Sequence, residues 1–423
     1  MPDPSFPDAH DPRADANVRD YAIITLTYWV FTLTDGALRM LVLLFLHELG
    51  YAPLQIAALF LFYEFFGVVT NFLGGWIGQR FGLKSTLFSG LSLQLIALGM
   101  LAVGADWLTV PYVMVAQAFS GIAKDLTKMS SKSYIKLVVP EDDHGGLMRW
   151  VALLTGSKNT IKGVGFFVGG ALLQFVGFQG GCIAMAVGIA AVLLVSYVAL
   201  PKAAGRSKTK VSFRSLIPPP GPIRWLSASR LFLFGARDVW FVLALPIFLG
   251  SVLGWDFHET GGFLALWIIG YGFVQAAAPA FVGGRGGRPA PDARRLGLWT
   301  AALVVPLGAI LLAFAFDAPP AIALVVGLAA FGIVFAANSA IHSYLIVAYA
   351  DGHKVAMRVG FHHMANAIGR LVGTVLSGAV FQAAGQGADG LMACIAVSIG
   401  FVVVSAGLCV PLAASERATP TSP

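Results

Sequence analysis

Long runs of apolar residues, separated by short polar segments, follow one another along most of the chain. A helix of about 20 apolar residues spans the ~30 Å hydrocarbon core of a bilayer, because each residue adds 1.5 Å. The pattern predicts twelve such helices, at about 21–47, 54–78, 84–103, 108–130, 147–175, 178–200, 226–252, 260–283, 296–316, 320–349, 355–384 and 389–412. We therefore expect an all-α, multi-pass membrane protein.

Composition supports this expectation. Hydrophobic residues make up 57% of the chain and charged residues only 12%, with a mean hydropathy of +0.78. Soluble domains carry about 25% charged residues. An ordinary soluble enzyme or binding domain is thereby excluded.

Basic residues gather in alternate loops between the predicted helices. The loops that would lie outside contain no Lys or Arg, whereas the others contain, for example, Arg80, Lys84, Arg149, Arg206 and Arg285. Such loops stay on the cytoplasmic side. Both termini are therefore predicted to be cytoplasmic and the protein to lie in the inner (cytoplasmic) membrane. The net charge of +7 then reports topology, and no nucleic-acid partner is expected.

Polar segments divide the chain into two halves of six helices each. We expect a disordered cytoplasmic tail at 1–20, an N-terminal half at 21–200, a basic cytoplasmic linker at 201–225, a C-terminal half at 226–412 and a C-terminal tail at 413–423. The first 20 residues lack an apolar core, so they do not read as a signal peptide.

The two halves repeat each other. A shift of 208 positions matches Lys162 with Arg370, and also Gly165 with Gly373, Gly170 with Gly378, Gln174 with Gln382 and Gly177 with Gly385. Two parallel six-helix repeats joined by a basic loop resemble the layout of the major facilitator superfamily. That resemblance implies transport by alternating access.

A short loop carries part of a signature of the same superfamily. Gly75-Trp-Ile-Gly-Gln79-Arg80-Phe-Gly82-Leu83-Lys84 resembles G-x-x-x-D-R-x-G-R-K, with Gln79 and Leu83 replacing an acid and a base. The predicted helix at 108–130 lacks the Arg of the R-x-x-Q-G pattern found in proton-coupled members, and 147–175 lacks the proline of drug antiporters. A generic drug exporter is therefore disfavoured.

Charged residues avoid four of the predicted helices and concentrate in the others. The third, sixth, ninth and twelfth contain no Asp, Glu, Lys or Arg in their apolar spans. A charge at bilayer depth costs at least ~2.5–3.5 kcal/mol, so intramembrane ionisable groups face cavities or one another. The distribution predicts four lipid-facing helices and a central, water-accessible cavity.

The deep bases outnumber the deep acids, which predicts a multivalent anion as substrate. Arginine binds an oxyanion through two parallel hydrogen bonds and lysine acts as a point charge. The predicted substrate-binding residues are Arg39, Lys124, Lys158, Lys162, Arg237 and Arg370, with Tyr28, Asn159, Asn338, His342, His362, His363 and Asn366 completing the shell. Asp35, Glu64 and Asp238 are predicted to serve proton coupling or gating.

Structural alternatives stand beside these roles. Asp35 with Arg39, or Arg237 with Asp238, would also serve as internal ion pairs, and Glu64 as the partner of a cation. Lys128, Arg230 and Arg358 lie nearer the cytoplasm and would also serve as interface anchors. Each neutral polar residue would also suit a contact between helices.

No cofactor or metal is expected. The three cysteines, Cys182, Cys394 and Cys409, lack metal-ligand spacing and are interpreted as small apolar filler. We find no nucleophile elbow or phosphate-cradling loop, so the protein is not expected to be an enzyme.

Five segments resemble one particular family. They are 28–76, SGIAKDLTKMSSKS (120–133), LTGSKNTIKGVGFFVGGALL (154–173), RLFLFGARDVWFV (230–242) and GGFLALWIIGYG (261–272). These strings are similar to the organoarsenical efflux permease family ArsJ. The resemblance implies export of 1-arseno-3-phosphoglycerate, made by a partner glyceraldehyde-3-phosphate dehydrogenase, and hence arsenate resistance.

The resemblance leaves several points open. An organophosphate or sugar-phosphate transporter without an arsenic role fits the residues equally well, because arsenate and phosphate differ little in charge and geometry. Proton antiport, uniport and exchange against phosphate are all compatible with the chain.

Overall fold

The computed structural model describes residues 12–48, 53–139, 143–200, 221–283, 289–350 and 354–418. The ends of both predicted tails and residues 201–220 of the predicted linker lie outside the described residues.

The described chain is almost entirely helical, as predicted. Its elements are α1 (Pro12–Glu48), α2 (Pro53–Phe81), α3 (Leu83–Leu101), the 3₁₀ turn η1 (Ala105–Trp107), α4 (Val110–Val138), α5 (His144–Ala199), α6 (Pro222–Phe241), α7 (Ala244–Ser251), α8 (Phe257–Ala277), α9 (Pro279–Val282), α10 (Ala293–Ala301), α11 (Val304–Ala315), α12 (Pro320–Ala348), α13 (Val355–Ala383) and α14 (Ala388–Ala418). Within the described ranges, eight helices are long and apolar enough to cross a membrane. The predicted all-α membrane fold is confirmed.

Three predicted helices are each interrupted near a proline. The span predicted at 226–252 divides into α6 and α7 just before Pro246, that at 260–283 into α8 and α9 at Pro279, and that at 296–316 into α10 and α11 just before Pro306. Proline removes a helical N–H and its ring crowds the carbonyl four residues earlier. Each pair of short helices still follows one predicted span.

One long helix contains two predicted ones. α5 bends at Gly177, whose φ of 71° and ψ of 177° are not helical. The matching residue of the other half, Gly385, has a φ of 103° and separates α13 from α14. Glycine adopts positive φ without steric cost. The glycines matched by the 208-residue repeat therefore form equivalent turns.

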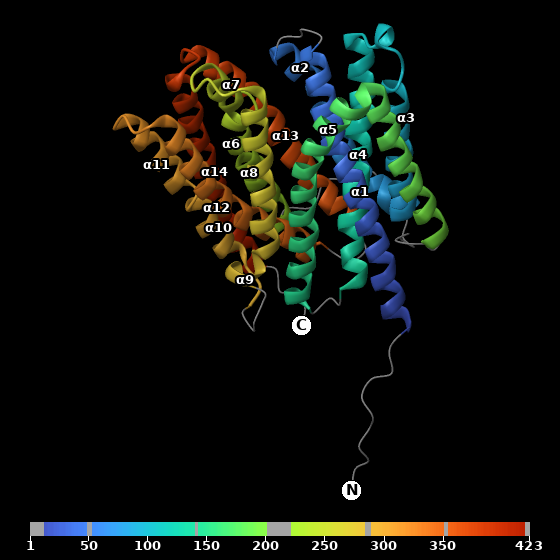
Figure 1. Cartoon of the computed structure of the whole chain (residues 1–423). Coiled ribbons are helices and arrows are strands. Elements are labelled where there is room, and N and C mark those ends of the chain that lie inside the picture. Colours follow the sequence, from blue (N-terminus) through green and yellow to red (C-terminus); the bar gives the residue numbers. More distant parts are fainter. Residues whose placement is uncertain are drawn as a thin grey trace.

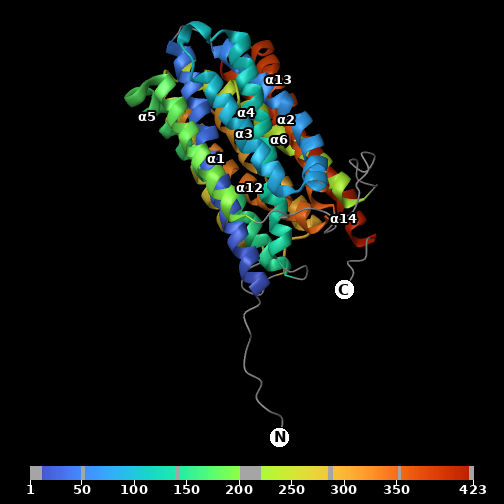
Figure 2. The ribbon, with the colours of Figure 1, turned by 90° about the vertical axis from the view of Figure 1, so that its right-hand side faces the viewer.

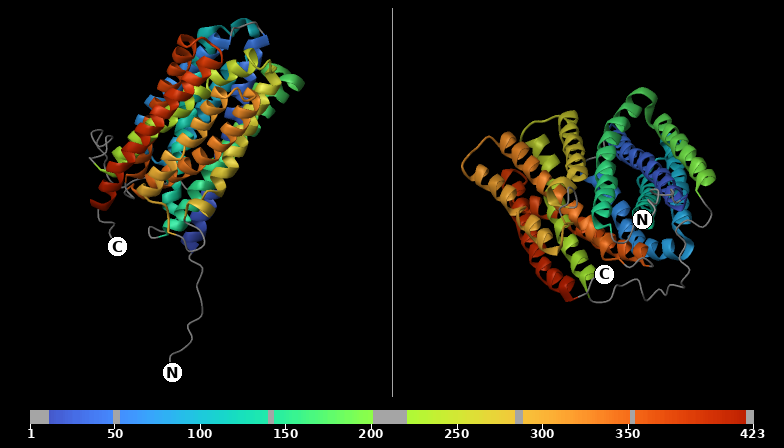
Figure 3. Two further views of the ribbon diagram at one scale, coloured as in Figure 1. Left: turned by 90° about the vertical axis from the view of Figure 1, so that its left-hand side faces the viewer. Right: turned by 90° about the horizontal axis from the view of Figure 1, so that it is seen from below.

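The helices form two groups (Figure 1). α1–α5 lie mostly on one side and α6–α14 mostly on the other when viewed along the bundle (Figure 3). α5 packs against α8, and α2 against α13, to join the halves. The start of α1 and the end of α14 lie toward the same end of the bundle (Figure 2), the end predicted to be cytoplasmic.

Within each half, glycines bring two helices into backbone contact. A Cβ on Gly165 of α5 would lie 2.5 Å from the Leu33 carbonyl oxygen of α1. A Cβ on the matching Gly373 of α13 would lie 2.7 Å from the Gly235 carbonyl oxygen of α6. Small residues at such crossings let membrane helices approach closely. These contacts fix α1 against α5 and α6 against α13.

Several helices begin earlier than the apolar pattern predicts. Asp143, Asp256 and Asp292 cap α5, α8 and α10, each accepting a hydrogen bond from a backbone N–H three residues on. A capping side chain satisfies a donor that the first turn leaves free. The apolar runs that guided the prediction start only after these polar turns.

The described parts of both predicted tails are helical, which corrects the prediction for them. α1 already begins at Pro12, and α14 continues to Ala418. Near the start of α1, Tyr134 donates a hydrogen bond to Asp20 at 3.3 Å and Tyr21 packs edge-on against Trp150. These contacts attach the start of α1 to α4 and α5, although the composition of the first 20 residues lacks an apolar core.

Candidate functional site

A cavity of about 270 Å³ lies between the two halves. Its walls come from α1, α2, α4, the first part of α5, α6, α8, α12 and α13. The four spans predicted to face lipid contribute no lining residue among those that the structure describes. They instead expose large apolar side chains such as Ile96, Val187, Leu312 and Val410.

Nine basic side chains line the cavity: Arg39, Lys124, Lys128, Lys132, Lys158, Lys162, Arg230, Arg237 and Arg370. Asp35, Glu64 and Asp125 are the acidic residues of the described lining. Asp238 is not part of the lining, but it contacts Arg237 and Arg370. Nine bases against four carboxylates leave an excess of five positive charges around this cavity.

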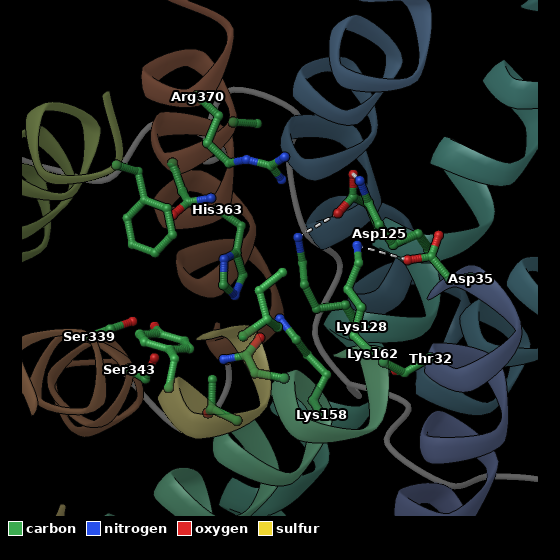
Figure 4. A pocket seen from close by; sticks show the side chains of 18 of the residues that line it. Thr32, Asp35, Asp125, Lys128, Lys158, Lys162, Ser339, Ser343, His363 and Arg370 are labelled. Atoms are coloured by element: carbon green, nitrogen blue, oxygen red, sulfur yellow. Dashed lines mark hydrogen bonds and ion pairs between the residues drawn. The ribbon is translucent and has the colours of Figure 1, made fainter. Parts of the chain in front are cut away.

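The N-terminal half contributes an ion pair between α5 and α1. Lys162 Nζ lies 3.2 Å from Asp35 Oδ2 (Figure 4). The Tyr63 hydroxyl donates a hydrogen bond of 2.6 Å to the other oxygen of the same carboxylate. The glycine contact between α1 and α5 positions both helices for this pair.

The C-terminal half contributes the equivalent arrangement between α13 and α6. Arg370 Nε donates to Asp238 Oδ2 at 3.1 Å, and Arg237 Nε donates to Asp238 Oδ1 at 2.6 Å. Asp238 is fully buried. Lys162 and Arg370, matched by the repeat, therefore each hold a carboxylate on the neighbouring helix of their own half.

Glu64 of α2 joins the two halves. Its Oε1 lies 2.5 Å from Arg370 Nη2 of α13 and 3.6 Å from Arg39 Nη2 of α1. We call Asp35, Glu64, Lys162, Asp238 and Arg370 the midplane network. In this network each carboxylate contacts at least one base, and one contact crosses between the halves.

The basic residues of α4 have different surroundings from one turn to the next. Lys128 forms an ion pair with Asp125, and Lys124 lies 3.9 Å from the same carboxylate and over the Tyr63 ring. Lys132 is 5% exposed and forms no ion pair or hydrogen bond with a described residue. Burial of a charged group without a partner is costly.

Lys158 and Arg230 also lack a carboxylate partner among the described residues. Lys158 extends from α5 into the cavity, and no interaction joins it to the side chains drawn in Figure 4. Arg230 donates only to neutral oxygens, those of Asn366 at 3.0 Å and Ser339 at 3.2 Å. We call Lys132, Lys158 and Arg230 the inner cluster.

Comparison with known proteins identifies the family. The sequence model described as "Major Facilitator Superfamily" matches residues 24–323. The chain belongs to this superfamily. It is a membrane transporter and not an enzyme, and no curated protein matches its sequence.

Solved structures of several transporters have a similar fold. The human organic anion transporter MFSD10 (TETRAN) is 16% identical, covering 95% of this chain and 100% of its own, with a TM-score of 0.72. A bacterial homologue of the iron transporter ferroportin in an outward-facing state is 14% identical over 94% and 100%, with a TM-score of 0.74. The proton:xylose symporter XylE is 14% identical over 93% and 95%, with a TM-score of 0.71. At these identities the likeness concerns the fold alone.

Most predicted site residues of this superfamily member line the cavity. The predicted bases do, as do Asp35, Glu64, Tyr28, Asn159 and Asn366. Two of the neutral residues are already engaged. Asn159 donates to Gln275 of α8 at 2.6 Å, and Asn366 accepts from Arg230.

Three predicted shell residues, Asn338, His342 and His362, are not among the residues that line the cavity, and their role in substrate binding stays a prediction. Asn338 donates to Thr300 of α10 at 2.6 Å, and His362 lies 3.4 Å from the Ser227 hydroxyl of α6. His342 is fully buried beside His362. On α12 the lining residues are instead Ser339 and Ser343, one position later and so about 100° around the helix.

The lining also includes bases that the sequence reasoning missed or set aside. Lys128 and Arg230 would also have suited interface anchors, but both side chains line the cavity. Lys132 was not singled out. Its spacing was the available signal, because Lys124, Lys128 and Lys132 recur every four residues and so share one face of α4.

The described residues contain no group of three or more His, Cys, Asp or Glu arranged to hold a metal ion. Cys182, Cys394 and Cys409 are buried free thiols on α5 and α14.

Proposed function

We propose that this transporter exports an organoarsenical anion, 1-arseno-3-phosphoglycerate, and thereby confers arsenate resistance. The observation that carries the anionic character of the substrate is the excess of five positive charges around the cavity. An uncompensated excess at bilayer depth favours an anion with several charges. The arsenical identity rests on the resemblance of five segments to organoarsenical efflux permeases.

The proposed substrate suits a cavity with separated basic groups. It carries an arsenate group at one end and a phosphate group at the other. The lining bases are distributed over both halves, from Lys162 on α5 to Arg370 on α13. An anion that contacts both halves would link its own binding to their relative movement, as alternating access requires.

The midplane carboxylates give this proposal a gating element. Glu64 contacts Arg370 across the halves and Arg39 within its own half. A substrate oxyanion that replaced the Glu64 carboxylate would free one half from the other. Asp35, Glu64 and Asp238 are also the groups through which inward proton flow would be coupled to export.

Arsenate survival tests the proposal directly. Arsenic-sensitive cells would receive this gene alone, a glyceraldehyde-3-phosphate dehydrogenase gene alone, or both, with membrane insertion verified. We expect resistance and lowered cell arsenic only with both genes, since the dehydrogenase supplies the arsenylated product. No protection from inserted protein would contradict the arsenical substrate and favour a phosphate-ester transporter.

A further inference from the structure

The bases around the cavity fall into two classes according to their partners. Six of the nine contact a carboxylate, at 2.5–3.2 Å in the midplane network; they are Arg39, Lys124, Lys128, Lys162, Arg237 and Arg370. Those of the inner cluster, Lys132, Lys158 and Arg230, contact no carboxylate among the described residues. A carboxylate already occupies the place that a substrate oxyanion would take at the first class, but not at the second.

The inner cluster lines a single cavity. Lys132, Lys158 and Arg230 all belong to its lining, and Lys132 and Arg230 are only 5% and 4% exposed. A bound dianion would stabilise the charged forms of these buried bases, which no carboxylate of the described residues does.

Two orphaned polar atoms on the cavity wall lie at the same level. Ser343 Oγ and His363 Nε2 are buried and have no hydrogen-bond partner among the described residues, and both residues line the cavity. Ser343 is one turn beyond Ser339, and His363 three residues before Asn366, the two residues that contact Arg230. A buried polar atom without a partner costs about 1–3 kcal/mol, which a ligand can recover.

Helix positions place four of these groups in one layer. Lys132, Arg230, Ser343 and His363 each lie about 8–12 Å from the end of their helix on the side where α1 begins, at 1.5 Å per residue. Lys158 lies about 21 Å along α5 by the same measure, so its long side chain enters the cavity from nearer the midplane network. Arg370 and Asp238 lie about 22–24 Å along α13 and α6 by the same measure. The layer is therefore displaced from the midplane network toward the end predicted to be cytoplasmic.

We propose that the inner cluster, with Ser343 and His363, forms the binding site for a tetrahedral oxyanion group of the substrate, the phosphate or arsenate end of the ester. This inference rests on the proposed anion transport and names the residues that recognise the charge. Arg230 supplies planar donors, the two lysines supply point charges, and Ser343 and His363 supply directed hydrogen bonds. The N-terminal half contributes the lysines and the C-terminal half the other three residues, so the bound group bridges the halves.

The test measures binding of inorganic phosphate, arsenate and 3-phosphoglycerate to the purified full chain in nanodiscs by titration calorimetry. We expect Lys132→Gln, Lys158→Gln and Arg230→Gln each to weaken binding of all three probes at least tenfold. Lys132→Arg keeps the charge and should bind within threefold of the unchanged protein. The matched control is Arg149→Gln, which removes one positive charge from the exposed start of α5, the helix of Lys158, away from the residues that line the cavity, and should change binding less than threefold.

The possible outcomes separate this inference from the proposed function. Full binding by the inner-cluster variants, with loss of binding in Lys162→Gln or in Arg370→Gln, would overturn the proposed binding site and leave an anion transporter with a midplane site. Binding that depends on the inner cluster, without any arsenate resistance in cells, would support the proposed oxyanion-binding site and contradict the arsenical substrate. No binding of any probe by the unchanged protein would contradict both.

Discussion

The midplane network and the inner cluster both contain buried bases, but only those of the midplane network have carboxylate partners among the described residues. Lys162 and Arg370 each face a carboxylate of their own half, and Glu64 adds a contact between halves. Lys132 and Lys158 face no carboxylate among the described residues, and Arg230 donates only to neutral oxygens. Removal of a base should therefore damage folding in the first region and substrate binding in the second. A cation at bilayer depth is thus not by itself a ligand-binding residue.

The largest effect should follow from Arg370→Ala. This change removes one of the two arginines that contact each of Asp238 and Glu64, and loss of one partner from a buried ion pair costs up to about 3–5 kcal/mol. We expect strongly reduced thermal stability in detergent and loss of export by at least a hundredfold. The variant Arg370→Gln with Glu64→Gln and Asp238→Asn should recover stability but not export. Normal export by Arg370→Ala would contradict the assigned role of the network.

Bulky residues at the matched glycines should disturb both halves equally. In Gly165→Leu and Gly373→Leu the new side chains would meet the backbones of α1 and α6. Separation of these helices would also separate Lys162 from Asp35 and Arg370 from Asp238, so stability and export should fall together.

Gly188→Leu is the matched control for this pair. No heavy atom lies within 4 Å of a Cβ at Gly188, and we expect its melting temperature to stay within a few degrees of the unchanged protein. A melting temperature as low as that of Gly165→Leu would show that the membrane span itself, and not the helix contact, had been disturbed.

A direct comparison of neighbouring lysines sharpens the contrast. Lys158 and Lys162 lie one turn apart on α5, but Asp35 pairs with Lys162. Lys162→Gln should lose about 3 kcal/mol of stability, and Asp35→Asn should restore most of it. Lys158→Gln should keep its melting temperature and raise the substrate KM at least tenfold. Equal effects on both quantities in the two variants would contradict the division into two classes.

The smallest effect is expected at Asn338. Its side chain bonds Thr300 and is not part of the described cavity lining. Asn338→Ala should cost about 1 kcal/mol of stability and leave the KM within twofold. Ser343→Ala, five residues further along the same helix, should raise the KM three- to fivefold. A larger KM change for Asn338→Ala would place Asn338 in the site after all.

Sequence reasoning anticipated the fold and the midplane because both follow from strong one-dimensional signals. Apolar run length predicted the membrane spans, and the 208-residue repeat paired Lys162 with Arg370 and Gly177 with Gly385. The structure places the matched bases in matched ion pairs and both glycines at turns.

The remaining lining could not be read off the sequence because it depends on helix rotation and depth. His362 and His363 are adjacent, but only His363 lines the cavity, and a rotation of about 100° separates them. The depth of Lys128 and Arg230 along their helices also suggested interface anchors. Both lie near the cytoplasmic ends of their predicted spans, yet the cavity extends to that level.

The backbone contacts at Gly165 and Gly373 also determine which interactions can survive a transport cycle. With no side chain between the helices, a slide of α5 along α1 or of α13 along α6 would drive backbone into backbone. Lys162–Asp35 and Arg370–Asp238 should therefore travel unbroken with their own halves. We expect the Glu64–Arg370 contact, which joins the two halves, to break and form again in each transport cycle.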